Sequence, residues 1–265
     1  MTGLRSVARH IGVRRKVIAP LRLRAERSAL AWLAAQPGRP GGRILCYHSV
    51  GTAQWGVNDV TPQRFRRQLE MAIERGYRFV PAERIACGAG SWNELAVTFD
   101  DGLKSVALNA APILAELGIP WSLFVVSEWA AGRHPFGEGV MLGWRDIERL
   151  AGARVGIGSH SVSHADFGYL SPAQAEAELF NSRRAIEQAI GIVPNAFAVP
   201  IGGTRNWTAD ASRIAREVGY DLIYAQAEDR RPAGTIARTF VTRYDGDRQF
   251  RAALAGAFDR WEEWV

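Results

Sequence analysis

The feature that most constrains the fold is the alternation of strand-like and helix-like segments between residues 43 and 265. Short apolar runs predict strands, and proline or glycine signals mark the starts and ends of the helices between them. Strands are expected at 44–48, 77–80, 95–99, 121–126, 154–158, 196–199, 220–225 and 236–241, and helices at 61–75, 105–117, 144–151, 171–190, 208–218 and 247–264. This order is typical of parallel strands with helical crossovers. It predicts an α/β domain, either a closed barrel or an open doubly wound sheet.

A basic segment precedes this domain. Residues 1–43 hold ten Lys or Arg against one acid, Glu26, so the net charge of this segment is +9. The whole chain has a net charge of +6, so the remaining residues have a net charge of −3. A helix is expected at 21–35 with Pro20 in its first turn, before a linker rich in Gly and Pro at 36–42. We therefore divide the chain into a basic N-terminal helical arm with its linker (1–42) and a main domain (43–265).

The charge of the arm predicts contact with anionic lipid, nucleic acid or a partner, or simply a solvated basic leader. Nothing in the arm supplies base-reading or stacking geometry, so no specific nucleic-acid partner is predicted. No apolar run reaches the length of a membrane span, and Arg or Lys interrupts every apolar stretch before residue 28. We expect a cytoplasmic protein, peripheral at the inner face of the membrane. Cys46 and Cys87 lie in or beside apolar stretches, which favours buried thiols over a disulfide.

Acidic and histidine side chains follow two of the expected strands. Asp100 and Asp101 come directly after the strand at 95–99, and His160 and His164 follow the strand at 154–158. Ligands gather at the carboxyl ends of parallel strands, where His48 and Pro200 are also expected. One carboxylate with two imidazoles makes a three-ligand site for a divalent metal, with a position open for water. The second carboxylate is then a base beside that water.

Each of these motifs also has a purely structural interpretation. Asp-Asp-Gly fits the N-cap of a helix near Ser105 as well as a catalytic turn. The spacing of His160 and His164 fits one helical turn, a loop leading into a turn, or two polar loop histidines. His48 fits a buried histidine that is hydrogen-bonded to the backbone. From the residues alone, these alternatives stay open.

The two motifs carry a resemblance to a known family. Thr98-Phe99-Asp100-Asp101-Gly102 and His160-Ser161-Val162-Ser163-His164 resemble the first two signature motifs of the polysaccharide deacetylases, the NodB-homology domain of carbohydrate esterase family 4. Further segments resemble the branch that contains the poly-N-acetylglucosamine deacetylases, at 45–50, 60–65, 141–144 and 197–202. Over about residues 43–250, the resemblance implies a distorted (β/α) TIM-like barrel, a divalent metal, commonly zinc, and removal of N-acetyl groups from a glycan.

The resemblance also implies a role for each residue. Asp101, His160 and His164 would bind the metal, Asp100 would be the general base, His48 would protonate the leaving amine, and the backbone N–H of Ile201 would hold the oxyanion. From their positions near predicted loop ends, Trp144 and Trp207 are expected to contact the sugar together with Pro200, whereas Trp121 is expected in the core. The third family motif often carries an Arg that orients the base, but here Val199 and Ile201 flank the proline. Arg205 is the nearby cation in the sequence.

The leading functional hypothesis is a metal-dependent hydrolase that removes N-acetyl groups from N-acetylhexosamine units of a polysaccharide or lipid-linked glycan precursor. Two alternatives keep the same residues. The first is an O-acetyl esterase or a deformylase that acts on an acylated sugar. The second is a degenerate glycan-binding member without turnover, to which the changes around Pro200 would point.

Overall fold

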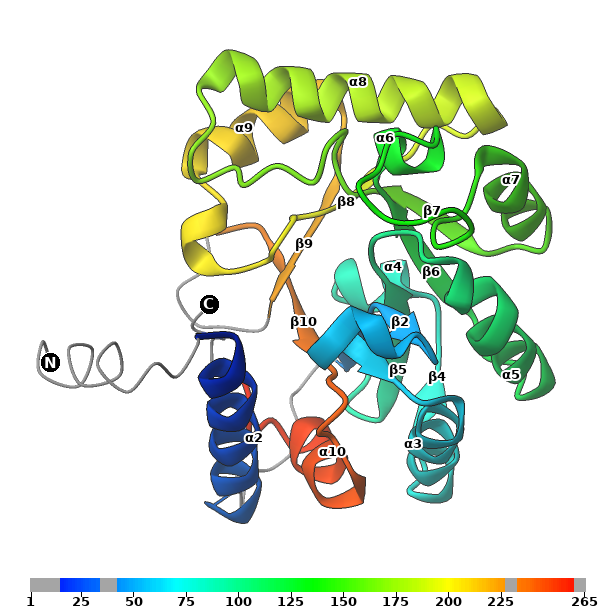
Figure 1. Cartoon of the computed structure of the whole chain (residues 1–265), viewed down its shortest axis with the longest axis vertical. Coiled ribbons are helices and arrows are strands. Elements are labelled where there is room, and N and C mark those ends of the chain that lie inside the picture. The colour runs from blue at the N-terminus through cyan, green and yellow to red at the C-terminus, as the bar shows by residue number, and fades with distance from the viewer. Residues whose placement is uncertain (1–14, 34–41, 227–232, 260–265) are drawn as a thin grey trace, which may run out of the picture.

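The computed structural model of the chain describes residues 15–33, 42–226 and 233–259. Within these ranges, seven parallel strands form a closed barrel, because β1 pairs with β5 on one side and with β10 on the other (Figure 1). In barrel order the strands are β1 (Arg43–Tyr47), β5 (Glu94–Phe99), β6 (Trp121–Val125), β7 (Gly156–Ser159), β8 (Ala196–Ala198), β9 (Leu222–Gln226) and β10 (Ile236–Phe240). The expected distorted (β/α) barrel is confirmed, and the open sheet is excluded.

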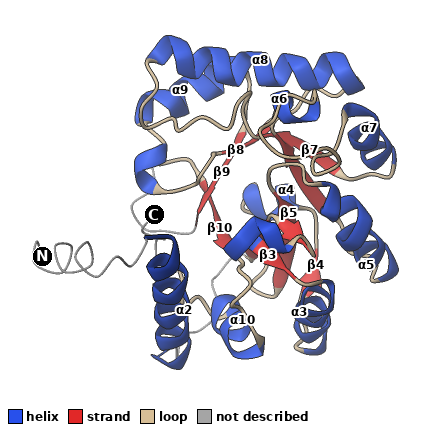
Figure 2. Cartoon of the chain, in the orientation of Figure 1, coloured by secondary structure: helices blue, strands red, loops and turns tan. Residues whose placement is uncertain are grey.

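Helices surround the strands (Figure 2). They are α2 (Arg15–Leu33), α3 (Pro62–Glu74), α4 (Ala82–Ala86), α5 (Ala111–Glu116), α6 (Ser127–Ala130), α7 (Trp144–Gly152), α8 (Pro172–Ile190), α9 (Ala209–Val218) and α10 (Asp247–Leu254). Shorter elements are the strand pair β2 (Ser49–Val50) and β3 (Asp59–Val60), and strand β4 (Arg78–Phe79) beside β5. The 3₁₀ helices are η1 (Ala53–Asn58) and η3 (Thr204–Asn206), and η2 (Val106–Ala110) is a π helix that leads into α5. The start signals act as expected, since Thr61 caps α3 and Ser171 forms a capping box with Gln174 at α8.

The core has an inner and an outer part. Alternate residues of the strands form one apolar cluster, which includes Ile44, Phe124 and Tyr224, and α4 packs against it. Gly158 of β7 is needed here, because a Cβ atom at this position would lie 2.5 Å from the ring of Phe124. The larger clusters are formed by buried side chains of the strands together with those of the helices. The polar residues at the carboxyl ends of the strands are therefore supported by a closely packed hydrophobic core.

Several local predictions need correction. Helix α2 begins at Arg15, so Pro20 lies inside it and not in its first turn. Helix α10 ends at Leu254, where the chain turns through a left-handed Gly256, and residues 260–264 of the expected helix lie outside the described part. The linker expected at 36–42 is also largely outside it. Both thiols are free, but Cys87 is exposed because it follows the last turn of α4 at the surface.

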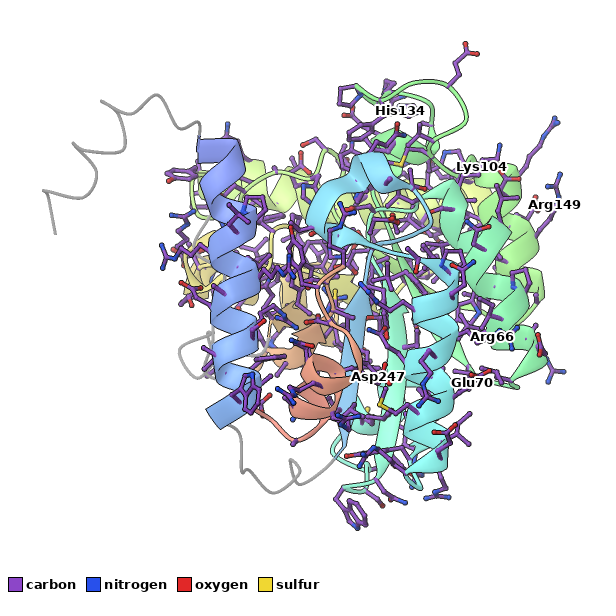
Figure 3. All side chains as sticks on the ribbon, turned by 60° about the horizontal axis from the view of Figure 1, so that its bottom comes forward. Arg66, Glu70, Lys104, His134, Arg149 and Asp247 are labelled. Atoms are coloured by element: carbon purple, nitrogen blue, oxygen red, sulfur yellow. The ribbon has the colours of Figure 1, made fainter. Side chains whose placement is uncertain are left out.

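The N-terminal helix α2 packs beside α10, which begins at the labelled Asp247 (Figure 3). Arg27 of α2 is buried and binds Asp245 through two bonds of 2.7 Å each, and Leu23 lies buried on the same side. The opposite side carries Leu21 and Trp32, which are 62% and 73% exposed. Among the described residues, no helix has both the length and the apolar character needed to cross a lipid bilayer.

Candidate active site

The two motifs meet at the carboxyl end of the barrel. Asp101 follows β5, while His160 and His164 follow β7, with β6 between these strands. Oδ1 of Asp101 lies 3.6 Å from Nε2 of His160 and 3.5 Å from Nε2 of His164. One ligand atom from each of the three side chains lies within 4.8 Å of the other two. The structure thus brings together the three predicted metal ligands.

Both imidazoles are oriented so that Nε2 faces Asp101. Nδ1 of His160 lies 2.8 Å from the carbonyl oxygen of Ala198, and a proton on Nδ1 leaves the lone pair on Nε2. The ring of His164 stacks on Trp129 at 5.3 Å. Burial lowers the pKa of His164 and lowers that of His160 to about 3. Both rings are therefore neutral at physiological pH, which is the state that binds a metal.

Asp101 lacks an internal partner for one of its oxygens. Oδ2 accepts a hydrogen bond of 3.3 Å from Nε1 of Trp55, but Oδ1 is buried and has no hydrogen-bond partner among the described residues. Burial raises the pKa of Asp101 to about 6. The nearby His48 lowers this pKa, and the charge of Asp100 raises it. A buried oxygen that faces two neutral imidazoles matches the donor set of a divalent metal such as zinc.

Both oxygens of the neighbouring carboxylate, Asp100, are paired within the protein. Its Oδ1 and Oδ2 accept hydrogen bonds of 2.6 and 2.7 Å from Nη1 and Nη2 of Arg238 on β10, and both side chains are buried. Burial alone would raise the pKa of Asp100, but the Arg238 guanidinium outweighs it and holds that pKa well below its usual range. The orienting cation that the third motif lacks is therefore Arg238, and not Arg205.

Two further residues, Cys46 of β1 and His48 just after it, border Asp100. Cys46 Sγ lies 3.4 Å from Asp100 Oδ2 and is the donor of that contact. His48 packs edge-on against Phe240 at 5.4 Å, and its buried Nδ1 has no hydrogen-bond partner among the described residues. Ligand atoms of Cys46, His48 and Asp100 also lie within 4.8 Å of one another. His48 thus lies beside Asp100, the predicted base, and its expected role as an acid stays a prediction.

Left-handed backbone is concentrated at this end of the barrel. Asp101, Ser161, His164 and Ile201 have φ values of 72°, 71°, 63° and 65°, although none of them is glycine. Such residues are uncommon and cost free energy, and they are enriched at functional sites. Residues 160–164 consequently form an irregular loop, and not the helical turn that their spacing allowed. Gly102, the next residue after Asp101, also has a positive φ of 79°, which glycine adopts without strain.

The predicted sugar-binding residues differ in their surroundings. Pro200 is buried just after β8, and Trp144 is partly buried against the main core. Trp207 is 3% exposed and stacks on Phe197, so we assign it to the core and not to substrate binding. Trp121 is in the core, as expected.

Sequence reasoning missed an aromatic cluster beside the three ligands, formed by Trp55, Trp129 and Phe136. Phe136 lies 4.7 Å from Trp55 and 5.1 Å from Trp129, between ring centroids. Trp55 contacts Asp101, and Trp129 contacts His164. Trp55 lies in η1, whereas Trp129 lies in α6 and Phe136 in the irregular segment after it, so no local motif connects all three rings.

Comparison with known proteins agrees with this geometry. The family model described as "Polysaccharide deacetylase" matches residues 89–223, which is just over half of the chain and includes both the acidic and the histidine motif. The chain belongs to the polysaccharide deacetylase family. A curated relative, YxkH of Bacillus subtilis (strain 168), is 21% identical over 184 residues, which cover 68% of this chain and 62% of YxkH. The match thus spans less than two thirds of that relative.

Solved structures share the barrel of this family. IcaB from Ammonifex degensii superposes with a TM-score of 0.68 at 24% identity, covering 84% of this chain and 99% of IcaB. The Streptococcus pyogenes deacetylase PplD, solved in complex with acetate, gives a TM-score of 0.65 at 21% identity, covering 79% of this chain and 94% of PplD. At these identities, the likeness establishes the fold.

Proposed function

We propose that this member of the family is a metal-dependent hydrolase that removes N-acetyl groups from N-acetylhexosamine units of a glycan. The observation that carries the proposal is the unpaired, buried Oδ1 of Asp101, which faces Nε2 of His160 and of His164. A folded protein rarely buries a carboxylate oxygen in this way unless a cation completes it. Membership of the polysaccharide deacetylase family supports the reaction.

The chain's own residues divide the chemistry between them. Asp101, His160 and His164 would hold a divalent metal, most simply zinc, which when bound supplies a Lewis acid and lowers the pKa of water. Asp100 accepts the proton of the attacking water, while the two hydrogen bonds from Arg238 keep its carboxylate ionised and fixed.

The remaining steps use His48, which follows β1, and the turn after β8. His48 lies beside Asp100 and donates a proton to the leaving amine, so that one amide bond and one water give acetate and a free amino sugar. The backbone N–H of Ile201 donates to the developing oxyanion from a left-handed turn. The half-buried faces of Trp55, Phe136 and Trp129 stack on the sugar ring, which extends the expected contacts of Pro200 and Trp144.

The test is a screen of purified full-length protein for acetate release from N-acetylglucosamine oligomers, with metal analysis of the same samples. We expect release by the wild type, and loss of both metal and turnover in Asp101→Ala and His164→Ala. Glu148→Ala, a change at an exposed residue of α7, is the control. Release from O-acetyl sugars alone, or of formate alone, would replace the proposal by the esterase or deformylase. Bound metal and glycan without any turnover would replace it by the binding protein.

We also propose that the outer face of α2 lies on an anionic lipid surface. Leu21, Ala25, Ala29 and Trp32 are spaced along one exposed side, and Arg22 and Arg24 flank them. Arg248 of α10 lies over the Trp32 ring at 3.7 Å and adds a further cation. An apolar stripe with basic flanks is the pattern of a helix that lies in a membrane interface. A cytoplasmic location and a lipid-linked substrate stay predictions that this contact would favour.

Sedimentation with vesicles tests this surface. We expect the protein to bind vesicles that contain phosphatidylserine and to be released by salt, because surface charges are screened. The double variant Leu21→Ser with Trp32→Ser should bind at least about tenfold more weakly, since it removes the apolar contact. Trp92→Ser, at an exposed tryptophan elsewhere, is the control. Equal binding of both variants would contradict the proposal.

A further inference from the structure

The loop that joins the two imidazole ligands is held by a residue outside both motifs. His160 and His164 stand at the two ends of this loop, and two of its residues adopt left-handed backbone conformations. The backbone oxygens of Ser161 and Val162 accept hydrogen bonds from the start of α6, at 3.1 and 3.0 Å. These contacts fix one side of the loop. The N–H groups on its other side point to α8.

Glu178 of α8 binds that other side. Its Oε2 accepts hydrogen bonds from the backbone N–H groups of Val162, at 2.8 Å, and of Ser163, at 3.0 Å. Its Oε1 accepts a third, from the Ser163 hydroxyl at 2.8 Å. One carboxylate thus satisfies two consecutive amides and a side chain midway between the ligands. Hydrogen bonds to a charged acceptor are about twice as strong as neutral ones.

The helix that carries Glu178 is itself tied to the strand that carries the ligands. Ser182, one turn further along α8, bonds with Ser159 at the end of β7 through their hydroxyl groups at 2.8 Å. Leu179 is fully buried in the core on this side of the barrel. The carboxylate of Glu178 therefore extends from a rigid support, while it remains only half-buried.

We propose that Glu178 is a positioning residue for the metal centre, and that it sets the separation and the direction of His160 and His164. This inference rests on the metal site of the proposed function. Glu178 touches neither the predicted ligand atoms nor the base. It acts by holding the backbone between the ligands, so that both Nε2 atoms face Asp101 before a metal arrives. Removal of such outer contacts costs about 10–100-fold in metal affinity.

The experiment is a competition titration of Zn²⁺ on the full-length protein against a chromophoric chelator. Glu178→Asp keeps the charge but shortens the reach, and Glu178→Gln keeps the reach but loses the charge. We expect Zn²⁺ affinity to fall about 10–100-fold in both. Ser163→Ala removes one contact of the three and should cost only about threefold. Glu176→Gln, an exposed change on the same helix, is the control and should leave the affinity unchanged.

Thermal unfolding in the presence of a chelator separates positioning from folding. We expect the metal-free variants to unfold within a few degrees of the wild type, because Glu178 is half-buried and its partners can turn to water. Wild-type affinity in Glu178→Asp would overturn the proposal, as would equal losses in Glu176→Gln. If Glu178→Gln does not fold, Glu178→Asp and Ser163→Ala still decide. Failure of the wild type to bind Zn²⁺ through Asp101 would instead refute the metal centre itself.

Discussion

The site has two halves, each built around one of two adjacent carboxylates, and the halves differ in how the carboxylate charge is balanced. The base half comprises Asp100, Arg238, Cys46 and His48, and the ligand half comprises Asp101, His160 and His164. Asp100 and Asp101 are 3% and 6% exposed, so burial affects them almost equally. Yet the pKa of Asp100 is held well below its usual range, whereas burial raises that of Asp101 to about 6.

The difference comes from the counterion. Arg238 supplies a cation to the base half from within the chain, so this half is complete once the barrel closes. The ligand half has two neutral imidazoles and no cation of its own among the described side chains within 4 Å of Asp101. Of two adjacent residues in one turn, Asp100 thus forms an ion pair within the protein, whereas Asp101 is placed to bind an external cation.

The largest expected effect is on the base half. Arg238→Met leaves Asp100 buried without its cation, and loss of one partner of a buried pair costs about 3–5 kcal/mol of unfolding free energy. The double variant Arg238→Met with Asp100→Asn should recover much of this loss, since no charge is left buried. Urea unfolding of the two variants and the wild type measures both values. Wild-type stability in Arg238→Met would remove the contrast between the halves.

The next effect is on turnover alone. His48→Gln should lower kcat about a hundredfold, because general acid catalysis contributes at least this much. Zn²⁺ affinity should stay within a few-fold of the wild type, since His48 is grouped with Cys46 and Asp100 and not with the ligand half. Acetate-release kinetics and the chelator titration measure the two quantities. A parallel loss of metal would show that His48 belongs to the ligand half.

In the ligand half, removal of the carboxylate charge should raise the stability of the metal-free protein instead of lowering it. In the presence of a chelator, Asp101→Asn should be more stable than the wild type by about 1–3 kcal/mol at pH 7, at about 1.4 kcal/mol for each unit of pKa. The raised pKa of about 6 means that the folded wild type loses stability as the pH rises from about 4 to about 6. The variant does not titrate there, so its advantage should grow over this range and vanish below it. Urea unfolding at pH 3.5, 5 and 7 provides the check, and a less stable variant at pH 7 would contradict the account.

The smallest expected effect concerns Zn²⁺ affinity and tests whether the aromatic cluster supports the metal ligands. Trp55→Phe keeps an aromatic ring but removes the 3.3 Å hydrogen bond to Oδ2 of Asp101. Because this bond is long, we expect Zn²⁺ affinity to fall by no more than about tenfold, the lower end of the range for such outer contacts. Trp92→Phe is the matched control. An unchanged affinity would restrict Trp55 to substrate contact.

The ligand half could be predicted from the sequence because its residues lie in two short motifs. Asp101, His160 and His164 each follow a strand, and the carboxyl ends of parallel strands lie at the same end of the barrel. Alternation of strands and helices predicted almost every element, but it left the closure of the sheet open. Closure depends on pairing of β1 with β10, which no local pattern specifies.

Arg238 was missed for the same reason. It is separated from Asp100 by 138 positions, and only closure of the barrel makes them neighbours. One signal was present, since Arg238 is the single charged residue of its strand, and a buried arginine needs an anionic partner. Trp207 shows the opposite error, because a tryptophan near a predicted loop end looks the same in sequence whether its ring packs inward or faces solvent.

The place of Arg238 on the last strand has a consequence for biosynthesis. A nascent chain that has been translated only as far as β9 already contains Asp100, Asp101, His48 and both imidazoles. It lacks the guanidinium that keeps Asp100 ionised in its buried position. In the proposed reaction, catalytic competence would therefore emerge only after β10 has been synthesised, and fragments that end before Arg238 would be inactive.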